Sequence, residues 1–392
     1  MDNAAMDPNA FQPESLAAQS LGWVDPVTKA ISPPIHASTT FIRDADNQYR
    51  SGRGYARADN PAFDQAEALI AQLERGAQGA LFASGMAAAT AVFHSLAPGD
   101  HVLAPKVMYW SLRNWLMNFA TQWGLQVELV DMADPAALRA AIQPGQTRLV
   151  WIETPANPLW TITDIAATVA LAHAAGARVA VDSTVATPVL TRPLELGADI
   201  VMHAATKYLN GHSDLIAGVL VTRTDDDFWK RVKAVRAQLG GTLGSFESWL
   251  LLRGMRTLYL RVRTASASAQ RIAEHFARHR LVEAVLYPGL RDAPDHAVAA
   301  RQMDGGFGGM LSIRVKGGSG GGEAAAIATA AHVQLWKRAT SLGGTESLIE
   351  HRASVEGAGT PAPPDLLRLS VGIEHVDDLI ADLEQALARA HG

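Results

Sequence analysis

A lysine that follows an apolar run is the first residue with an evident chemical use. Residues 199–202 read Asp-Ile-Val-Met, a run typical of a buried parallel strand, and Lys207 lies a few residues further on among turn formers. Burial disfavours the charged ammonium, so a lysine in this setting can lose its proton and attack an aldehyde. The alternative is an ordinary surface lysine, since charged residues are mostly exposed.

An acidic residue ends a second apolar run, upstream of that lysine. Residues 177–181 are apolar apart from one arginine, and Asp182 follows them. The ends of successive strands are where open α/β sheets bind ligands. Pyridoxal phosphate needs a lysine for its aldehyde and an acid that keeps its pyridine nitrogen protonated. Asp182 could instead cap a helix, but together with Lys207 it favours a pyridoxal-phosphate site.

The residues around Lys207 resemble the motif of a known family. The run His-Ala-Ala-Thr-Lys-Tyr-Leu-Asn-Gly-His-Ser-Asp at 203–214 is similar to the lysine motif of the cystathionine γ-synthase, cystathionine lyase and methionine γ-lyase family, and the resemblance extends over residues 33–387. It implies pyridoxal 5'-phosphate as cofactor and an α/β architecture, the pyridoxal-phosphate transferase fold type I. That fold has a mainly parallel, seven-stranded sheet in a large domain and a smaller C-terminal α+β domain.

Composition narrows the class of protein. The chain has 392 residues with 48% hydrophobic content, which is ample for two domains. A net charge of −5 without a long basic run disfavours nucleic acid as a partner. The chain has no cysteine, which excludes a disulfide framework and a thiolate metal site, and no metal is expected. The acidic residues 1–7 lack a signal-peptide pattern and no apolar stretch could span a bilayer, so we expect a cytoplasmic protein without a membrane partner.

The order of expected elements divides the chain into three parts. Strands and helices alternate from 79 to 222, which predicts a mainly parallel sheet with helices on both faces. We predict an N-terminal arm at 1–54, a pyridoxal-phosphate-binding domain at 55–265 and a C-terminal substrate-side domain at 266–392. Prolines interrupt the arm, which is either a mobile terminus or, as the resemblance implies, a segment that wraps a neighbouring subunit.

Several local patterns lead to further expectations. Residues 112–123 and 228–263 are predicted to be helical, and the C-terminal part is expected to contain strands at 281–286, 310–315 and 366–371. The glycine-rich run 317–322 lacks the spacing of a phosphate loop and predicts a surface loop. The core candidates in the second helical stretch are Phe246, Trp249, Leu250, Leu251 and Leu252.

A second segment could bind phosphate. A strand at 79–83, followed by Ser84, Gly85 and Met86 and then an alanine-rich helix, offers backbone N–H groups to an anion. The signal is weak alone, but the resemblance implies that these three residues form the phosphate cup and that Thr206 adds a hydroxyl. Relatives often carry serine where this chain has Ala204, so one phosphate contact is expected to be missing.

Tyr55 and Arg57 lie just before a helix that Asn60 and Pro61 are predicted to start. The guanidinium fork of Arg57 suits phosphate, and Tyr55 offers a hydroxyl. Arg57 could equally be a solvated loop residue. The resemblance implies that the pair reaches the cofactor phosphate of the partner subunit. Self-association as a homodimer at least, and a homotetramer by resemblance, is therefore expected.

Two residues are implied to contact the cofactor ring. Tyr109 follows the strand at 101–104, and the resemblance implies that it stacks on the pyridine ring and passes a proton, although Trp110 stands where relatives have glycine. The alternative is that both aromatics are core residues. Asn157, in an Asn-Pro turn after the strand at 147–153, is implied to bind the cofactor's phenolic oxygen and the substrate. Thr184 completes the implied cofactor-binding set.

The C-terminal part carries the implied substrate contacts. Arg368 has the bidentate geometry that suits a carboxylate, and the resemblance implies that it binds the substrate α-carboxylate. Ser341 belongs to a segment similar to the loop that closes over the substrate. Thr340 departs from the glutamate or aromatic residue that separates the subfamilies, whereas Leu342 resembles the γ-acting members.

These residues predict an enzyme with Lys207 and Tyr109 as catalytic residues. The resemblance implies pyridoxal-phosphate-dependent γ-elimination or γ-replacement on a homoserine-derived or sulfur amino acid in trans-sulfuration. The first alternative is a cystathionine β-lyase, which releases homocysteine, pyruvate and ammonia. The second is a cofactor-binding scaffold without turnover, which would not need both Lys207 and Asp182.

Overall fold

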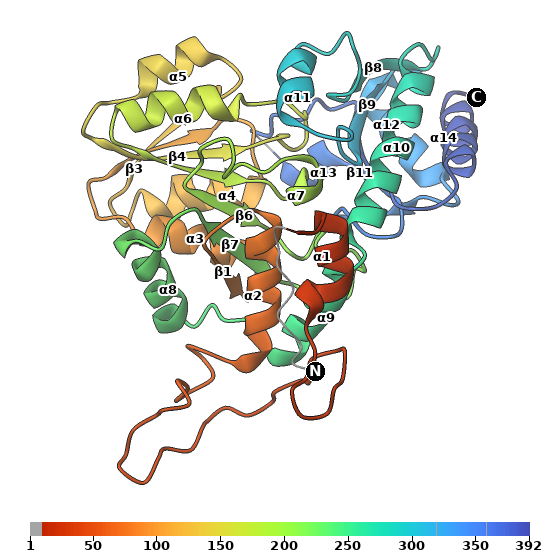
Figure 1. Ribbon diagram of the computed structural model, residues 1–392. Coiled ribbons are helices and arrows are strands. Elements are labelled where there is room, and N and C mark those ends of the chain that lie inside the picture. The colour runs from red at the N-terminus through yellow and green to blue at the C-terminus, as the bar shows by residue number, and fades with distance from the viewer. Residues whose placement is uncertain (1–9, 319, 358) are drawn as a thin grey trace. The chain divides into compact units, whose positions relative to one another are not determined.

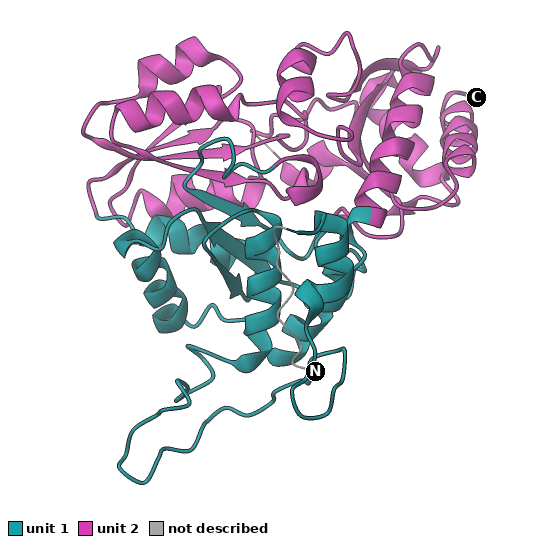
Figure 2. Ribbon diagram, in the orientation of Figure 1, with its two compact units in different colours: residues 1–97, 192–259 teal, residues 98–191, 260–392 magenta. Residues whose placement is uncertain are grey.

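The computed structural model describes residues 10–318, 320–357 and 359–392. The acidic stretch 1–7 and Ser319 of the glycine-rich run lie outside this part of the chain. Two compact units are found, each made from two separate stretches: residues 1–97 with 192–259, and residues 98–191 with 260–392 (Figure 2). The predicted division into arm and two domains follows the chain order and stays a prediction. Within the described residues, no helix is long and apolar enough to cross a membrane.

Unit 1 contains a sheet with the order β1-β7-β6, in which β7 runs antiparallel to both neighbours. β6 and β7 are buried along their whole length, which explains why their sequences are almost continuously apolar. Its elements are α1 (Pro13–Gln19), the 3₁₀ turn η1 (Ser20–Gly22), α2 (Pro61–Leu73), β1 (Gln78–Phe82), α3 (Gly85–His94), β6 (Ile200–His203), β7 (Gly218–Thr222), α8 (Asp227–Leu239) and α9 (Ser245–Met255).

The helix that follows the arm starts as the sequence predicts. The side chain of Asn60 accepts a hydrogen bond from the N–H of Ala62 at 2.9 Å, and Pro61 is the first helical residue. One face of α2 is buried, with Phe63 and Leu69 among its core residues.

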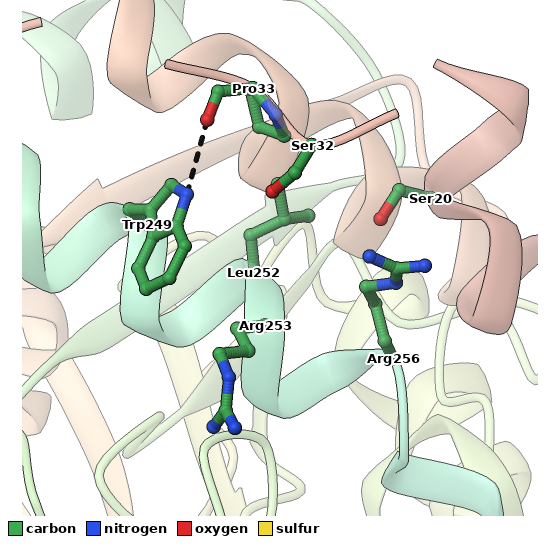
Figure 3. Close-up of a pocket in the computed structure, with 7 residues that line it drawn as sticks. All are labelled: Ser20, Ser32, Pro33, Trp249, Leu252, Arg253 and Arg256. Carbon is green, nitrogen blue, oxygen red and sulfur yellow. Dashed lines mark hydrogen bonds between the residues drawn. The ribbon is translucent and has the colours of Figure 1, made fainter. Parts of the chain in front are cut away.

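Between η1 and α2 the chain has little regular structure and forms a long loop that leaves the body of unit 1 (Figure 1). Its base is fixed where the indole N–H of Trp249 donates to the carbonyl of Pro33 at 3.1 Å (Figure 3). Apolar side chains on the loop are open, with Val27 87% and Ile42 94% exposed.

A small pocket of about 140 Å³ lies where the base of this loop meets α9 (Figure 3). None of the residues predicted to form the active site lines it. The core prediction for α9 is partly wrong: Leu251 and Leu252 are buried, but Phe246 is 54% exposed. The lining residues are Ser20, Ser32, Pro33, Trp249, Leu252, Arg253 and Arg256.

Unit 2 begins with four parallel strands in the order β5-β4-β2-β3, and α5 and α6 pack on one face of them (Figure 1). Together with the three strands of unit 1 they number seven, the predicted count. The elements are β2 (His101–Pro105), α4 (Trp110–Trp115), the π-helical turn η2 (Leu116–Ala120), β3 (Gln126–Val130), α5 (Pro135–Ala141), β4 (Thr147–Glu153), α6 (Ile165–Ala174), β5 (Arg178–Asp182) and α7 (Thr187–Leu190).

The rest of unit 2 is a five-stranded sheet, β10-β11-β12-β9-β8, antiparallel except for β10 with β11. Its core is formed with three helices, α10, α12 and α14. The elements are α10 (Leu258–Phe276), β8 (Val282–Leu286), α11 (His296–Gln302), β9 (Met310–Val315), α12 (Gly321–His332), β10 (Lys337–Arg338), β11 (Leu348–His351), α13 (Arg352–Glu356), β12 (Leu366–Ser370) and α14 (Val376–His391).

Three local expectations need correction. The helix predicted at 112–123 starts earlier, at Trp110, and continues as a π-helical turn. The predicted loop at 317–322 is shorter, because α12 already begins at Gly321. The sequence pattern missed β10 and β11, since β10 has two residues and β11 carries buried Glu350 and His351, which hide its apolar character.

Candidate active site

Lys207 lies four residues beyond the end of β6, in a turn of unit 1. Its backbone is held on both sides: its N–H donates to the carbonyl of Ala204 at 3.0 Å, and its carbonyl accepts from the N–H of Gly211 at 2.8 Å. The side chain is half-buried. The wholly buried strand therefore ends in a fixed turn that carries the lysine.

The predicted phosphate cup is a helix N-terminus in the same unit. Ser84 caps α3, and its hydroxyl oxygen accepts from the N–H of Ala87 at 3.0 Å. That contact uses the oxygen and leaves the hydroxyl proton available for an anion. Gly85 and Met86 lie in the first turn of α3. The backbone N–H groups of a first helical turn have no acceptor within the helix. Backbone N–H groups, a hydroxyl and the helix dipole together suit phosphate.

Contact between small residues brings the phosphate cup next to the lysine segment. A Cβ atom added to Gly85 would lie 2.8 Å from the Cβ of Ala204. The start of α3 therefore packs directly on the segment that leads to Lys207, and no larger side chain fits between them. Thr206 is also in place, but its hydroxyl is engaged with the backbone of Ala217, donating at 3.2 Å and accepting at 3.0 Å.

Tyr55 and Arg57 are not part of this cluster. Both side chains are exposed, Tyr55 at 54%, and the guanidinium of Arg57 lies 5.5 Å from the centre of the Tyr55 ring. They belong to the long loop that leaves unit 1 (Figure 1). Their position leaves both polar groups open to a second molecule.

In unit 2, Asp182 is the last residue of β5 and is 8% exposed. Thr184 holds its carboxylate: the backbone N–H and the hydroxyl of Thr184 both donate to Oδ1, at 3.0 and 2.5 Å. A buried carboxylate fixed in this way suits a protonated ring nitrogen, because an opposite charge offsets the cost of burial.

Glu153 was not predicted from the sequence, and it lies directly beside Asp182. It ends β4, and the two residues are partners in the parallel ladder. Its Oε2 accepts from the N–H of Tyr109 at 2.6 Å and its Oε1 from the N–H of Asn157 at 2.9 Å. Burial, and then the charge of Asp182, raise the pKa of Glu153 to about 8. A glutamate at the end of a buried strand, just before the Asn-Pro turn, was the available signal.

Arg368 forms hydrogen bonds with two other predicted site residues of unit 2, Asn157 and Ser341. Its Nη1 donates to the side-chain oxygen of Asn157 at 3.3 Å, and its Nη2 donates to the carbonyl of Ser341 at 2.8 Å. Glu350, its partner across β11 and β12, forms an ion pair with Nη2 at 2.6 Å. Burial, and then the nearby Arg352, lower the pKa of Arg368 to about 10, so the guanidinium stays charged at neutral pH.

A buried ionic cluster surrounds that arginine. Glu350 also pairs with Arg352 at 2.7 Å, and Arg352 pairs in turn with Glu356. Arg352 is 4% exposed, and although burial opposes it, Glu350 and Glu356 raise the pKa of its guanidinium. This cluster was missed as well, since its pairs depend on the register of two strands.

The two units thus hold two sets of predicted residues. Unit 1 brings Lys207, Thr206 and the phosphate cup together. Unit 2 brings Tyr109, Asn157 and Asp182 together through Glu153, and joins Arg368 and Ser341 to them through Asn157. Within unit 1, the helix N-terminus beside the lysine suits the phosphate of pyridoxal phosphate. Within unit 2, the buried acid suits a protonated ring nitrogen.

Comparison with known proteins places the chain in a family. Residues 14–388 match the family described as Cys/Met metabolism PLP-dependent enzyme. A cystathionine γ-synthase of Mycobacterium tuberculosis is 45% identical, with 93% of each chain covered, and an L-methionine γ-lyase of Porphyromonas gingivalis is 40% identical, with 93% of this chain and 94% of the relative covered. A crystal structure of cystathionine γ-synthase from Xanthomonas oryzae in complex with cystathionine superposes with a TM-score of 0.91 at 37% identity, covering 97% of this chain and 98% of that one.

The class that follows is a pyridoxal-phosphate-dependent enzyme with an α/β fold. The chain belongs to the Cys/Met metabolism family of pyridoxal-phosphate enzymes. The predicted family, fold class, cofactor and enzyme type, that of cystathionine γ-synthase and γ-lyase, are confirmed. Its substrate is an amino acid.

Proposed function

We propose that this enzyme replaces the γ-substituent of an activated homoserine with a thiol amino acid, as a cystathionine γ-synthase does. The observation that carries the proposal is the 45% identity to a protein named cystathionine γ-synthase over 93% of both chains. Leu342, which resembles the γ-acting members, is in keeping with it. γ-Elimination by the same residues is the side reaction that we expect. We also propose that the enzyme works in the cytoplasm.

In unit 1, Lys207 is proposed to hold the aldehyde of the cofactor and then to move protons. Bound pyridoxal phosphate supplies an electron sink for the carbon next to the amino group. The Nζ of Lys207 would take the Cα proton of the substrate and would next move a Cβ proton, which would allow the γ-substituent to leave. Ser84, Gly85, Met86 and Thr206 are proposed to bind the phosphate; the hydroxyl of Thr206 must first turn away from Ala217.

In unit 2, Asp182 is proposed to keep the ring nitrogen protonated, with Thr184 holding its carboxylate in place. Tyr109 is proposed to stack on the ring and to donate a proton to the leaving group, which its 44% exposed side chain is free to approach. Asn157 would bind the phenolic oxygen.

Arg368 is proposed to bind the substrate α-carboxylate. Its orientation is supported by hydrogen bonds to Asn157 and to the carbonyl of Ser341. A fixed carboxylate keeps the bonds that break aligned with the electron sink, which lowers the entropic part of the barrier.

Assembly is proposed to complete the site. Tyr55 and Arg57 are exposed on a loop with open apolar side chains, which supports a role in binding the cofactor phosphate of a partner subunit. A homodimer is the smallest assembly that provides this, and we propose a homotetramer. Sedimentation of the holoenzyme measures the assembly.

The test is product identity from the cofactor-loaded enzyme. An O-acyl homoserine with cysteine should yield cystathionine, and the same ester alone should yield 2-oxobutyrate more slowly. Pyruvate with homocysteine from cystathionine would instead identify a β-lyase. Protein that binds the cofactor but converts no amino acid would identify a scaffold.

A further inference from the structure

One buried carboxylate joins two loops of unit 2 that carry proposed cofactor contacts. Glu153 is 6% exposed and accepts a backbone hydrogen bond on each oxygen, from Tyr109 at 2.6 Å and from Asn157 at 2.9 Å. The charges that act on it most strongly, those of Asp182 and Glu356, are negative like its own. A buried acid beside like charges is costly, and such groups gather at functional sites.

The two residues it holds depend on this anchor. Tyr109 is the N-cap residue of α4 but makes no side-chain capping bond, and its side chain is 44% exposed. The hydrogen bond from its backbone N–H to Glu153 fixes the point from which the ring extends. Asn157 likewise follows β4 in a turn, and its side chain reaches Arg368.

The position of Glu153 also affects the charge of the site. Its partner in the strand ladder is Asp182, and the negative charge of Glu356 also raises the pKa of Glu153. Two neighbouring carboxylates cannot both carry a charge cheaply, so a proton on Glu153 removes repulsion from Asp182. The donors that face Glu153 are the N–H groups of Tyr109 and Asn157.

We propose that Glu153 is a positioning residue for the cofactor: by holding the backbones of Tyr109 and Asn157 beside Asp182, it places the aromatic ring and the amide against the cofactor ring. The inference rests on the proposed roles of these residues. It does not depend on which reaction follows.

The experiment compares Glu153→Gln with Asp382→Asn in the cofactor-loaded enzyme. Glutamine keeps the shape but has one acceptor oxygen, so one N–H loses its partner. Asp382 is the matched control: it is 8% exposed, lies in α14 and accepts from the backbone N–H groups of Gln334, Leu335 and Trp336 at 2.7–3.0 Å.

Cofactor dissociation, visible circular dichroism of the bound cofactor, kcat, KM and Tm are measured for both variants. For Glu153→Gln we expect cofactor binding weaker on the order of tenfold, a smaller visible dichroism, and a fall in kcat that exceeds the change in KM. For Asp382→Asn we expect a lower Tm with unchanged cofactor binding and dichroism. Glu153→Gln with a lower Tm alone would overturn the proposal.

A double-mutant cycle sharpens the test. In a Tyr109→Ala background, the effect of Glu153→Gln on cofactor binding should shrink, because the ring that it positions is absent. Equal effects in both backgrounds would overturn the proposal. If the glutamine variant fails to fold, Glu153→Asp keeps both carboxyl oxygens but shortens the reach, and its dichroism is compared in the same way. If the wild-type enzyme binds the cofactor but forms no γ-product, the proposed function is wrong. The comparison of the two variants by cofactor binding and dichroism then still tests the role of Glu153.

Discussion

The two units hold their candidate site residues by different means. In unit 1 the phosphate cup and the lysine segment meet through small residues, Gly85 against Ala204, and through backbone hydrogen bonds. In unit 2 buried ionisable side chains do the holding: Glu153 fixes two backbones and Glu350 pairs with Arg368. A close backbone approach is disrupted when an atom is added to it. A buried ionic network is destabilised when one partner is removed or can no longer reach the other.

The largest loss of activity should come from replacing Lys207, which the backbone contacts of unit 1 hold in place. Lys207→Ala removes the amine that attaches the cofactor and moves protons, so we expect turnover below detection and loss of covalent cofactor attachment. Both are measured by product assay and by cofactor retention on gel filtration. Lys230→Ala, an exposed lysine paired with Asp227, is the control and should match wild type. Turnover retained by Lys207→Ala would contradict the assignment.

The charge network of unit 2 is tested next, by changing geometry at constant charge. Arg368→Lys keeps the cation but loses the planar guanidinium fork, which reaches Asn157 with Nη1 and Ser341 with Nη2 and suits a carboxylate. We expect kcat/KM to fall on the order of 100-fold, mainly through a higher KM. Arg314→Lys in the neighbouring strand, where the arginine pairs with Asp365, is the control. Equal, small losses in both variants would show that Arg368 has no special role.

In unit 1 the corresponding test adds an atom to a tight contact instead of removing a group. Gly85→Ala places a methyl group 2.8 Å from the Cβ of Ala204, so the start of α3 must move. Overpacking of this kind costs about 1–3 kcal/mol, and we expect weaker binding of the cofactor, by about tenfold, in a titration. The control is Gly318→Ala, where the nearest atom is 3.7 Å away. Cofactor affinity unchanged in Gly85→Ala would show that the cup tolerates movement.

The same contrast explains what the sequence could predict. The lysine motif, the cup at Ser84 and the cap at Asn60 are contiguous patterns whose residues act on their near neighbours, so local reasoning finds them. Glu153 and Glu350 act on residues far along the chain, 44 positions away at Tyr109 and across a strand ladder at Arg368. Register and the assembly of units from separated stretches decide such pairs, and no local pattern encodes them.

The smallest expected effect separates the charge of Glu153 from its shape, through pH. Its pKa is raised to about 8 from the ordinary glutamate value of 4.5, so the folded state holds the proton more tightly than the unfolded state. The resulting stabilisation is complete below about pH 4.5 and is lost as pH rises through 8. Glu153→Gln does not titrate, so the Tm of apo wild type should fall relative to that of the variant, by a few degrees, between pH 5 and 8.5.

Thermal unfolding of both apoproteins at each pH measures this difference. Groups common to the two proteins titrate alike and cancel, which leaves the contribution of one carboxyl. A Tm difference that stays constant with pH would mean that Glu153 is ionised throughout, with its two N–H donors outweighing burial and the charge of Asp182. The buried Glu153 carboxyl would then be stabilised by its two hydrogen bonds and not by binding a proton.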